Sequence, residues 1–160
     1  MKLNLAISSR DKKYSTTPKL RALLRRAIML TLESEGLEGE YDVSLAVVDA
    51  DEIREINKSF RNVDSATDVL SFPLSEDVFG EDNSLPISLG DIIVCGEVID
   101  GQAGDFGNDY VSEFIYMTIH STLHLLGYDH VDSPEEEKTM FEKQDAVFEK
   151  FKKESENFNG

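Results

Sequence analysis

The sequence contains one cysteine, four prolines and no tryptophan, and its three histidines all fall between residues 120 and 130. Cys95 has no second cysteine to pair with, which excludes an internal disulfide, and its apolar surroundings predict a small core residue. No apolar run approaches the roughly 20 residues that a membrane-spanning helix needs. The segment MKLNLAISSRDKKYS lacks the apolar stretch and cleavage site of a signal peptide. We therefore expect a cytoplasmic protein with no membrane partner.

Basic residues are scarce, and half of them stand near the start of the chain. The net charge is −16, from 16 basic and 32 acidic side chains, yet residues 1–26 carry eight of the bases and a single acid. This distribution indicates either solvated faces of both signs or a basic surface, suited to a phosphate backbone, on an acidic body. The candidates for guiding RNA or docking on a ribosome are Lys19, Arg21, Arg25 and Arg26.

Apolar patterning predicts an α+β fold, with a small mixed β-sheet of about four strands packed with helices. A chain of 160 residues is expected to form one domain, residues 1–160, with a frayed tail at about 154–160. Pro73 indicates an edge or the end of a strand because it cannot donate to a ladder. The expected strands are 3–8, 41–49, 68–74 and 89–99; the expected helices are 18–36, 50–60, 109–126 and 133–153; residues 75–88 are expected to form an acidic loop.

The histidines have the spacing of a metal site on a helix followed by a glycine turn. His120 and His124 are four residues apart, so they project from one helix face. Gly127 ends the helix, and His130 follows the turn closely enough to swing back. Three imidazoles favour one zinc ion with a fourth position left for water. The alternative, three ordinary histidines clustered by chance, is less consistent with this spacing.

The same spacing raises the possibility of a zinc peptidase. His120, His124, Gly127 and His130 match the offsets of the motif H-E-x-x-H-x-x-G-x-x-H. In those peptidases the residue after the first histidine is the glutamate that acts as general base. Here that position is Ser121, whose hydroxyl cannot accept a proton from water at neutral pH. A peptidase is therefore the second candidate.

Two separated stretches resemble the YbeY endoribonucleases. HSTLHLLGYDH, residues 120–130, is similar to the signature of that family, and INKSFRNVDSATDVLSFP, residues 56–73, is similar to a second conserved segment. LGDI, residues 89–92, is a weaker third agreement. The chain departs from the family pattern at Ser121, where glycine is usual, and at Ala66, where proline is usual. Ser121 is expected to add a side chain beside the metal.

The resemblance implies a single metal-dependent endoribonuclease-like domain, specific for single-stranded RNA. It further implies action in small-subunit rRNA 3′-end maturation and ribosome quality control in the cytoplasm, with rRNA and the ribosome or its small-subunit proteins as partners. Zinc would be held by His120, His124 and His130, and Arg61 would be catalytic because a cation neutralises phosphate charge. The oligomeric state stays open.

Other interpretations of these residues also stay open. Arg61 has the alternative of a surface salt bridge. Asp68 either orients a group near the site or bonds its own backbone in a turn. Asp129 either supports an imidazole N–H as an outer carboxylate or points away. The protein as a whole has the alternative of a non-catalytic assembly factor that uses zinc only to brace its structure.

Overall fold

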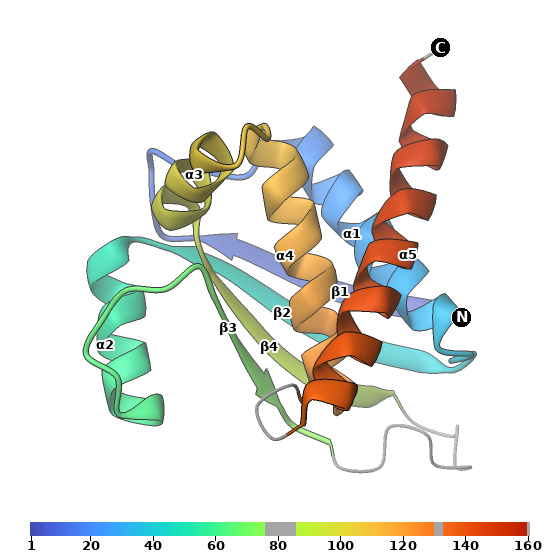
Figure 1. The fold of residues 1–160 in the computed structure, drawn as a ribbon, viewed down its shortest axis with the longest axis horizontal. Coiled ribbons are helices and arrows are strands. Elements are labelled where there is room, and N and C mark those ends of the chain that lie inside the picture. The colour runs from blue at the N-terminus through green and yellow to red at the C-terminus, as the bar shows by residue number, and fades with distance from the viewer. Residues whose placement is uncertain (76–85, 130–132, 160) are drawn as a thin grey trace.

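The computed structural model describes residues 1–75, 86–129 and 133–159, and within them it shows a four-stranded sheet with helices on both faces (Figure 1). The strand order is β1-β2-β4-β3, in which β1, β2 and β4 are parallel and β3 runs antiparallel to β4. The expected α+β class with a small mixed sheet is therefore confirmed. The elements are β1 (Lys2–Ser9), α1 (Pro18–Ser34), β2 (Glu40–Val48), α2 (Ala50–Arg61), β3 (Val69–Pro73), β4 (Ile87–Cys95), α3 (Gly96–Asp105), α4 (Tyr110–Leu125) and α5 (Pro134–Asn159).

Alternating side chains of the central strands divide the core between the two faces of the sheet. Ile92 and Val94 of β4 belong to the large cluster beneath α1, α4 and α5, whereas Ile93 and Cys95 pack with the smaller cluster beneath α2. This is the two-residue period of a strand that is buried on both faces. Figure 1 shows α4 crossing one face beside α1 and α5, with α2 standing apart from them.

Helix ends follow local signals in the sequence. The side chain of Thr17 accepts a hydrogen bond from the backbone N–H of Leu20 at 3.1 Å, and Pro18 takes the first helical position of α1. Asp109 caps α4 in the same way. Gly127 has φ +102 just after α4, a backbone conformation that favours glycine. These features place the C-terminal end of α4, which carries His120 and His124, next to a tight turn.

Two boundaries differ from the expectations. The strand expected over 89–99 ends at Cys95, and residues 96–99 begin α3. A short continuous apolar run has no period that separates a strand from a helix, and here Ile99 and Ala103 are buried with helical spacing. Helix α5 runs to Asn159, beyond its expected end near residue 153. Most of the expected acidic loop lies outside the described residues.

The expectations for Pro73 and Cys95 are met. Pro73 lies on β3, which is an edge strand. Cys95 is buried, and this burial raises the pKa of its thiol. In the described part of the chain, no helix combines the length and apolar character needed to cross a membrane.

Gly90 sits where β3, β4 and α4 meet, and it offers a test of this packing. Its φ is +142, and a Cβ there would collide with the backbone carbonyl of Phe72. Gly90→Ala is expected to destabilise the fold by roughly 2–4 kcal/mol. Gly101→Ala, on α3 with nothing within 4 Å of the added carbon, should instead stabilise it by about 0.5–1 kcal/mol. Urea unfolding measures the change in the free energy of unfolding for both variants. Equal changes would contradict the close approach of Gly90 to Phe72.

Candidate active site

A pocket of about 550 Å³ opens between β3 and the C-terminal end of α4. It brings together His120 and His124 of α4 with Arg61 from the end of α2, which precedes His120 by 59 positions in the sequence. Asp68 and Asp129 also border it. The described lining consists of Arg61, Thr67, Asp68, Val69, Leu70, Ser71, Pro73, Met117, His120, His124, Gly127, Tyr128 and Asp129.

The two imidazoles converge. The Nε2 atoms of His120 and His124 are 3.1 Å apart, and the ring centroids are 4.6 Å apart. Two nitrogens bound to one tetrahedral zinc at 2.0–2.1 Å would be about 3.3 Å apart. The described pair therefore fits two adjacent positions of a zinc ligand set with almost no movement.

Gln144 of α5 fixes the orientation of His120. Its Oε1 lies 2.9 Å from Nδ1 of His120, and its Nε2 donates to the carbonyl oxygen of Tyr116 at 3.4 Å. This orientation of the amide favours the tautomer of His120 in which Nδ1–H donates to Oε1, and that tautomer leaves the lone pair of Nε2 directed toward His124. Outer partners of this kind support a ligating histidine. Gln144 is buried, and no local motif in the sequence marks it as part of the site.

The third expected ligand, His130, lies outside the described residues. Within the described chain, no group of three or more histidine, cysteine, aspartate or glutamate side chains is arranged to hold a metal ion. The geometry thus supports the pair His120 and His124, and the complete ligand set remains a prediction.

Arg61 reaches the pocket across the free edge of the sheet. Its Nη2 donates to the carbonyl oxygen of Ser71 at 2.8 Å, and its guanidinium lies 5.6 Å from the ring centroid of Phe72. Asn62, with φ +61, ends α2 and turns the chain back toward β3. Among the described residues Arg61 forms no ion pair, so the alternative of a surface salt bridge is not observed.

Asp68 and Asp129, which both border the pocket, differ in the contacts that their side chains make. Asp68 accepts from the backbone N–H of Val69 at 2.8 Å and from the hydroxyl of Thr67 at 3.2 Å. This matches the interpretation of Asp68 as a turn residue that bonds its own backbone. Asp129 borders the pocket directly after Tyr128, so a role as an outer carboxylate stays a prediction.

Ser121 does not stand where the sequence suggested. Its side chain is 0% exposed and is absent from the described lining of the pocket. Its hydroxyl has no hydrogen-bond partner within the described residues. The departure from the family pattern therefore places a polar hydroxyl in the protein interior beside α4. Serine at this position affects the packing of the helix rather than access to the pocket.

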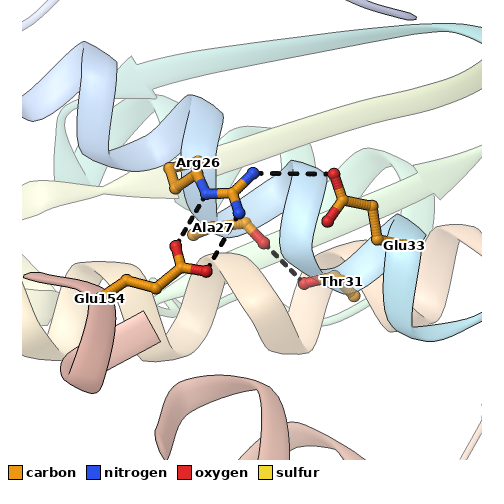
Figure 2. A network of polar contacts seen from close by, with 5 residues as sticks. All are labelled: Arg26, Ala27, Thr31, Glu33 and Glu154. Atoms are coloured by element: carbon orange, nitrogen blue, oxygen red, sulfur yellow. Dashed lines mark hydrogen bonds and ion pairs between the residues drawn. The ribbon is translucent and has the colours of Figure 1, made fainter. Parts of the chain in front are cut away.

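Two of the four basic residues of α1 expected to guide RNA, Arg25 and Arg26, are held by other parts of the protein, whereas Arg21 bonds to Thr16 just before the helix. Arg26 makes a two-pronged contact with Glu154 at 2.9 and 3.1 Å and lies 3.6 Å from Glu33 (Figure 2). Arg25 donates to the carbonyl oxygen of Leu3 at 2.7 Å. Neither side chain borders the histidine pocket. Their clearest role in the structure is to join α1 to α5 and β1.

A second cluster anchors the turn after α4. The hydroxyl of Tyr128 donates to Oε2 of Glu35 at 2.7 Å, and Nζ of Lys143 donates to Oε1 of Glu35 at 3.1 Å. These contacts connect the end of α1, the turn at Gly127 and helix α5. The side chain of Glu35 is only 7% exposed. Because its partners are 93 and 108 residues away, sequence spacing gave no signal of this cluster.

The chain matches proteins of known family over nearly its whole length. The family model described as Endoribonuclease YbeY matches residues 6–152. The chain is 43% identical over 159 residues to Endoribonuclease YbeY of Caldanaerobacter subterraneus, covering 92% of this chain and 97% of the relative. It is 39% identical over 155 residues to the protein of that name from Acetivibrio thermocellus, covering 91% and 94%. A solution structure from Thermotoga maritima superposes with a TM-score of 0.65 at 34% identity, covering 96% and 93%.

The fold and pocket define a small α+β protein with paired imidazoles and an arginine at the edge of its sheet. The relatives that share this sequence are named as endoribonucleases, enzymes that cleave phosphodiester bonds within RNA. The chain belongs to the YbeY endoribonuclease family.

The anchor at Glu35 yields a stability test. Lys143→Met should lower the free energy of unfolding by roughly 1–3 kcal/mol because it leaves a buried carboxylate without its cation. Lys138→Met is the control on the same helix, since its 3.9 Å pair with Glu142 is exposed and contributes little. Thermal and urea unfolding compare the two variants.

The difference in unfolding free energy between wild type and Lys143→Met should also depend on pH. The contact with Glu35 raises the pKa of Lys143 above its ordinary value of 10.5. The stabilisation is therefore complete below pH 10.5 and is lost as the pH rises through the raised pKa. Wild type and Lys143→Met should converge in strongly alkaline buffer. A difference that grows with pH would show that the ammonium group is not the cause.

Proposed function

We propose that this protein is a zinc-dependent endoribonuclease specific for single-stranded RNA. It would act in small-subunit rRNA 3′-end maturation and ribosome quality control, in the cytoplasm, on rRNA presented by the ribosome or its small-subunit proteins. His120, His124 and His130 would hold one zinc ion, and Arg61 would contact the phosphate. The observation that carries the proposal is the meeting of the converging His120–His124 pair and Arg61 in one pocket of a YbeY family fold.

The residues divide the chemistry between them. A zinc ion held by imidazoles acts as a Lewis acid and activates water. Arg61 supplies a fixed positive charge where a phosphodiester gains negative charge on the way to cleavage. The bond to Ser71 holds the guanidinium in place before substrate arrives, so little reorganisation is needed. Gln144 keeps the proton of His120 on Nδ1, away from the pocket.

The free edge of β3 argues against the peptidase alternative. Asp68 and Leu74 bond to β4, so Val69, Ser71 and Pro73 direct their backbone groups outward. A substrate peptide that added as a strand would need these groups. The N–H of Val69 is bonded to Asp68, the carbonyl of Ser71 is bonded to Arg61, and Pro73 has no N–H. The edge beside the histidines therefore offers a peptide fewer backbone partners than an uninterrupted strand would.

The alternative is a non-catalytic assembly factor with a structural zinc. It differs from the enzyme in whether the domain stays folded when a zinc ligand is substituted. A structural ion contributes to folding, so removing a ligand unfolds the domain. Here α4 is held by a large apolar cluster whose members include Phe114, Ile115, Ile119 and Leu123. The fold should therefore survive the loss of one imidazole in the pocket.

His124→Ala tests the proposal directly. Purified wild type should contain close to one zinc ion per chain and cleave single-stranded RNA, whereas His124→Ala should lose the metal and at least about 100-fold in cleavage rate while staying folded. Metal analysis, circular dichroism and cleavage of a single-stranded oligoribonucleotide provide the readouts. Cleavage of an unfolded protein instead of RNA would establish the peptidase, and unfolding of His124→Ala would establish the structural zinc.

Arg61 can be tested against a neighbour on the same helix. Arg61→Ala should lower kcat/KM for RNA by about 10²–10³-fold with unchanged zinc content, because one charge contact to the reacting phosphate is lost. Arg54→Ala is the matched control: Arg54 also lies on α2, but it pairs with Asp64 at the surface. Equal losses in the two variants would remove Arg61 from the site.

Gln144 is expected to control metal affinity. Gln144→Leu should weaken zinc binding by about 10–100-fold because His120 loses the acceptor that fixes its orientation. Gln144→Glu retains an acceptor at the same place, so it should bind zinc more tightly than Gln144→Leu does. Competition with a zinc chelator gives both affinities without any RNA. Identical affinities for Gln144→Leu and wild type would refute this role.

A further inference from the structure

Phe60 is a large aromatic side chain exposed beside the pocket. It is 71% exposed and directly precedes Arg61 at the end of α2. Its ring packs edge-on against Phe72 of β3, with centroids 5.4 Å apart and an interplanar angle of 68°. Because Phe72 also lies beneath the guanidinium of Arg61 at 5.6 Å, the exposed ring and the cation share one support.

The fold explains how Phe60 comes to be uncovered. Residues 53, 56, 57 and 60 fall on one face of α2, and Ile53 and Asn57 on that face are buried. Phe60 continues the same face, but it packs against β3, which is the last strand of the sheet. Among the residues that the structure describes, no further strand lies beyond β3 to cover the ring. An aromatic side chain held in place on one side and open on the other is a surface on which a flat ligand can stack.

The surroundings of Phe60 fit one kind of ligand. Stacking on an aromatic ring next to a cation suits a nucleobase joined to a phosphate, and it operates on any base because every base has a π-face. Phe72 packs on the α2 face of β3, and Arg61 links this face to the pocket. Its guanidinium lies 5.6 Å from the ring centroid of Phe72, bonds to the carbonyl oxygen of Ser71 and borders the pocket. Val63, three residues further along the chain, is also exposed.

We propose that Phe60, supported by Phe72, stacks the base of a nucleotide adjacent to the phosphate that Arg61 contacts. This inference rests on the proposed endoribonuclease function and adds to it a reason for single-strand specificity. A base must leave its helix to stack on a protein side chain, which a paired nucleotide does only at a cost. Phe60 would therefore contribute to substrate binding rather than to the bond-breaking step.

The test uses the full-length, zinc-loaded protein and a single-stranded oligoribonucleotide that contains 2-aminopurine. Phe60→Ala should weaken RNA binding and raise KM by roughly 10–100-fold, with kcat and zinc content close to wild type. Phe60→Trp should retain binding and quench 2-aminopurine fluorescence on stacking, whereas Phe60→Leu, which keeps an apolar side chain without a ring, should behave like Phe60→Ala. Circular dichroism checks that each variant is folded.

Phe106→Ala is the matched control. Phe106 is also 71% exposed, but it follows α3 and is absent from the described lining of the histidine pocket. Its substitution should leave RNA binding unchanged. If wild type cleaves RNA while Phe60→Ala and Phe106→Ala bind it equally well, or if Phe60→Leu binds as tightly as wild type, stacking is refuted and the endoribonuclease stands. If wild type neither binds nor cleaves the oligoribonucleotide, both proposals are refuted.

Discussion

The hydrogen bond from Arg61 to the carbonyl oxygen of Ser71 joins the two faces of the sheet across the free edge of β3. Helix α2 lies against one face of this edge and α4 against the other, so residues of both helices can enter one pocket only around β3. If β3 were covered by another strand, Arg61 and the histidines would be on opposite sides of the sheet. The position of β3 at the edge is thus the constraint on which the site depends.

Helix α4 serves the core and the pocket at the same time. Its inward side chains, including Phe114, Ile119 and Leu123, are completely buried, and each contributes roughly 1.5–3 kcal/mol to folding. This stabilisation is large compared with the cost of holding two imidazoles close together at the other side of the helix. The position of His120 is then refined from α5, through Gln144. The described imidazole pair of the site is therefore held by two helices, α4 and α5.

The parts of this structure that could be predicted from the sequence are those that depend on neighbours within a few residues. The caps at Thr17 and Asp109, the turn at Gly127 and the pairing of His120 with His124 all follow from local spacing. Gln144 and the Glu35 cluster could not be predicted, because their partners come together only when the helices pack. Ser121 shows the limit within the motif itself, since one position along a helix turns a side chain from the pocket into the core.

The charge of the protein shapes how it would meet RNA. With a net charge of −16, its long-range field repels a polyanion, and Arg25 and Arg26 are already engaged within the protein. Affinity for RNA grows with the number of phosphates that basic side chains neutralise. A site that relies on Arg61 and a stacking ring neutralises few, so its binding should depend only weakly on salt. Weak electrostatic attraction of free RNA is in keeping with the proposal that a ribosomal subunit presents the single strand to the pocket.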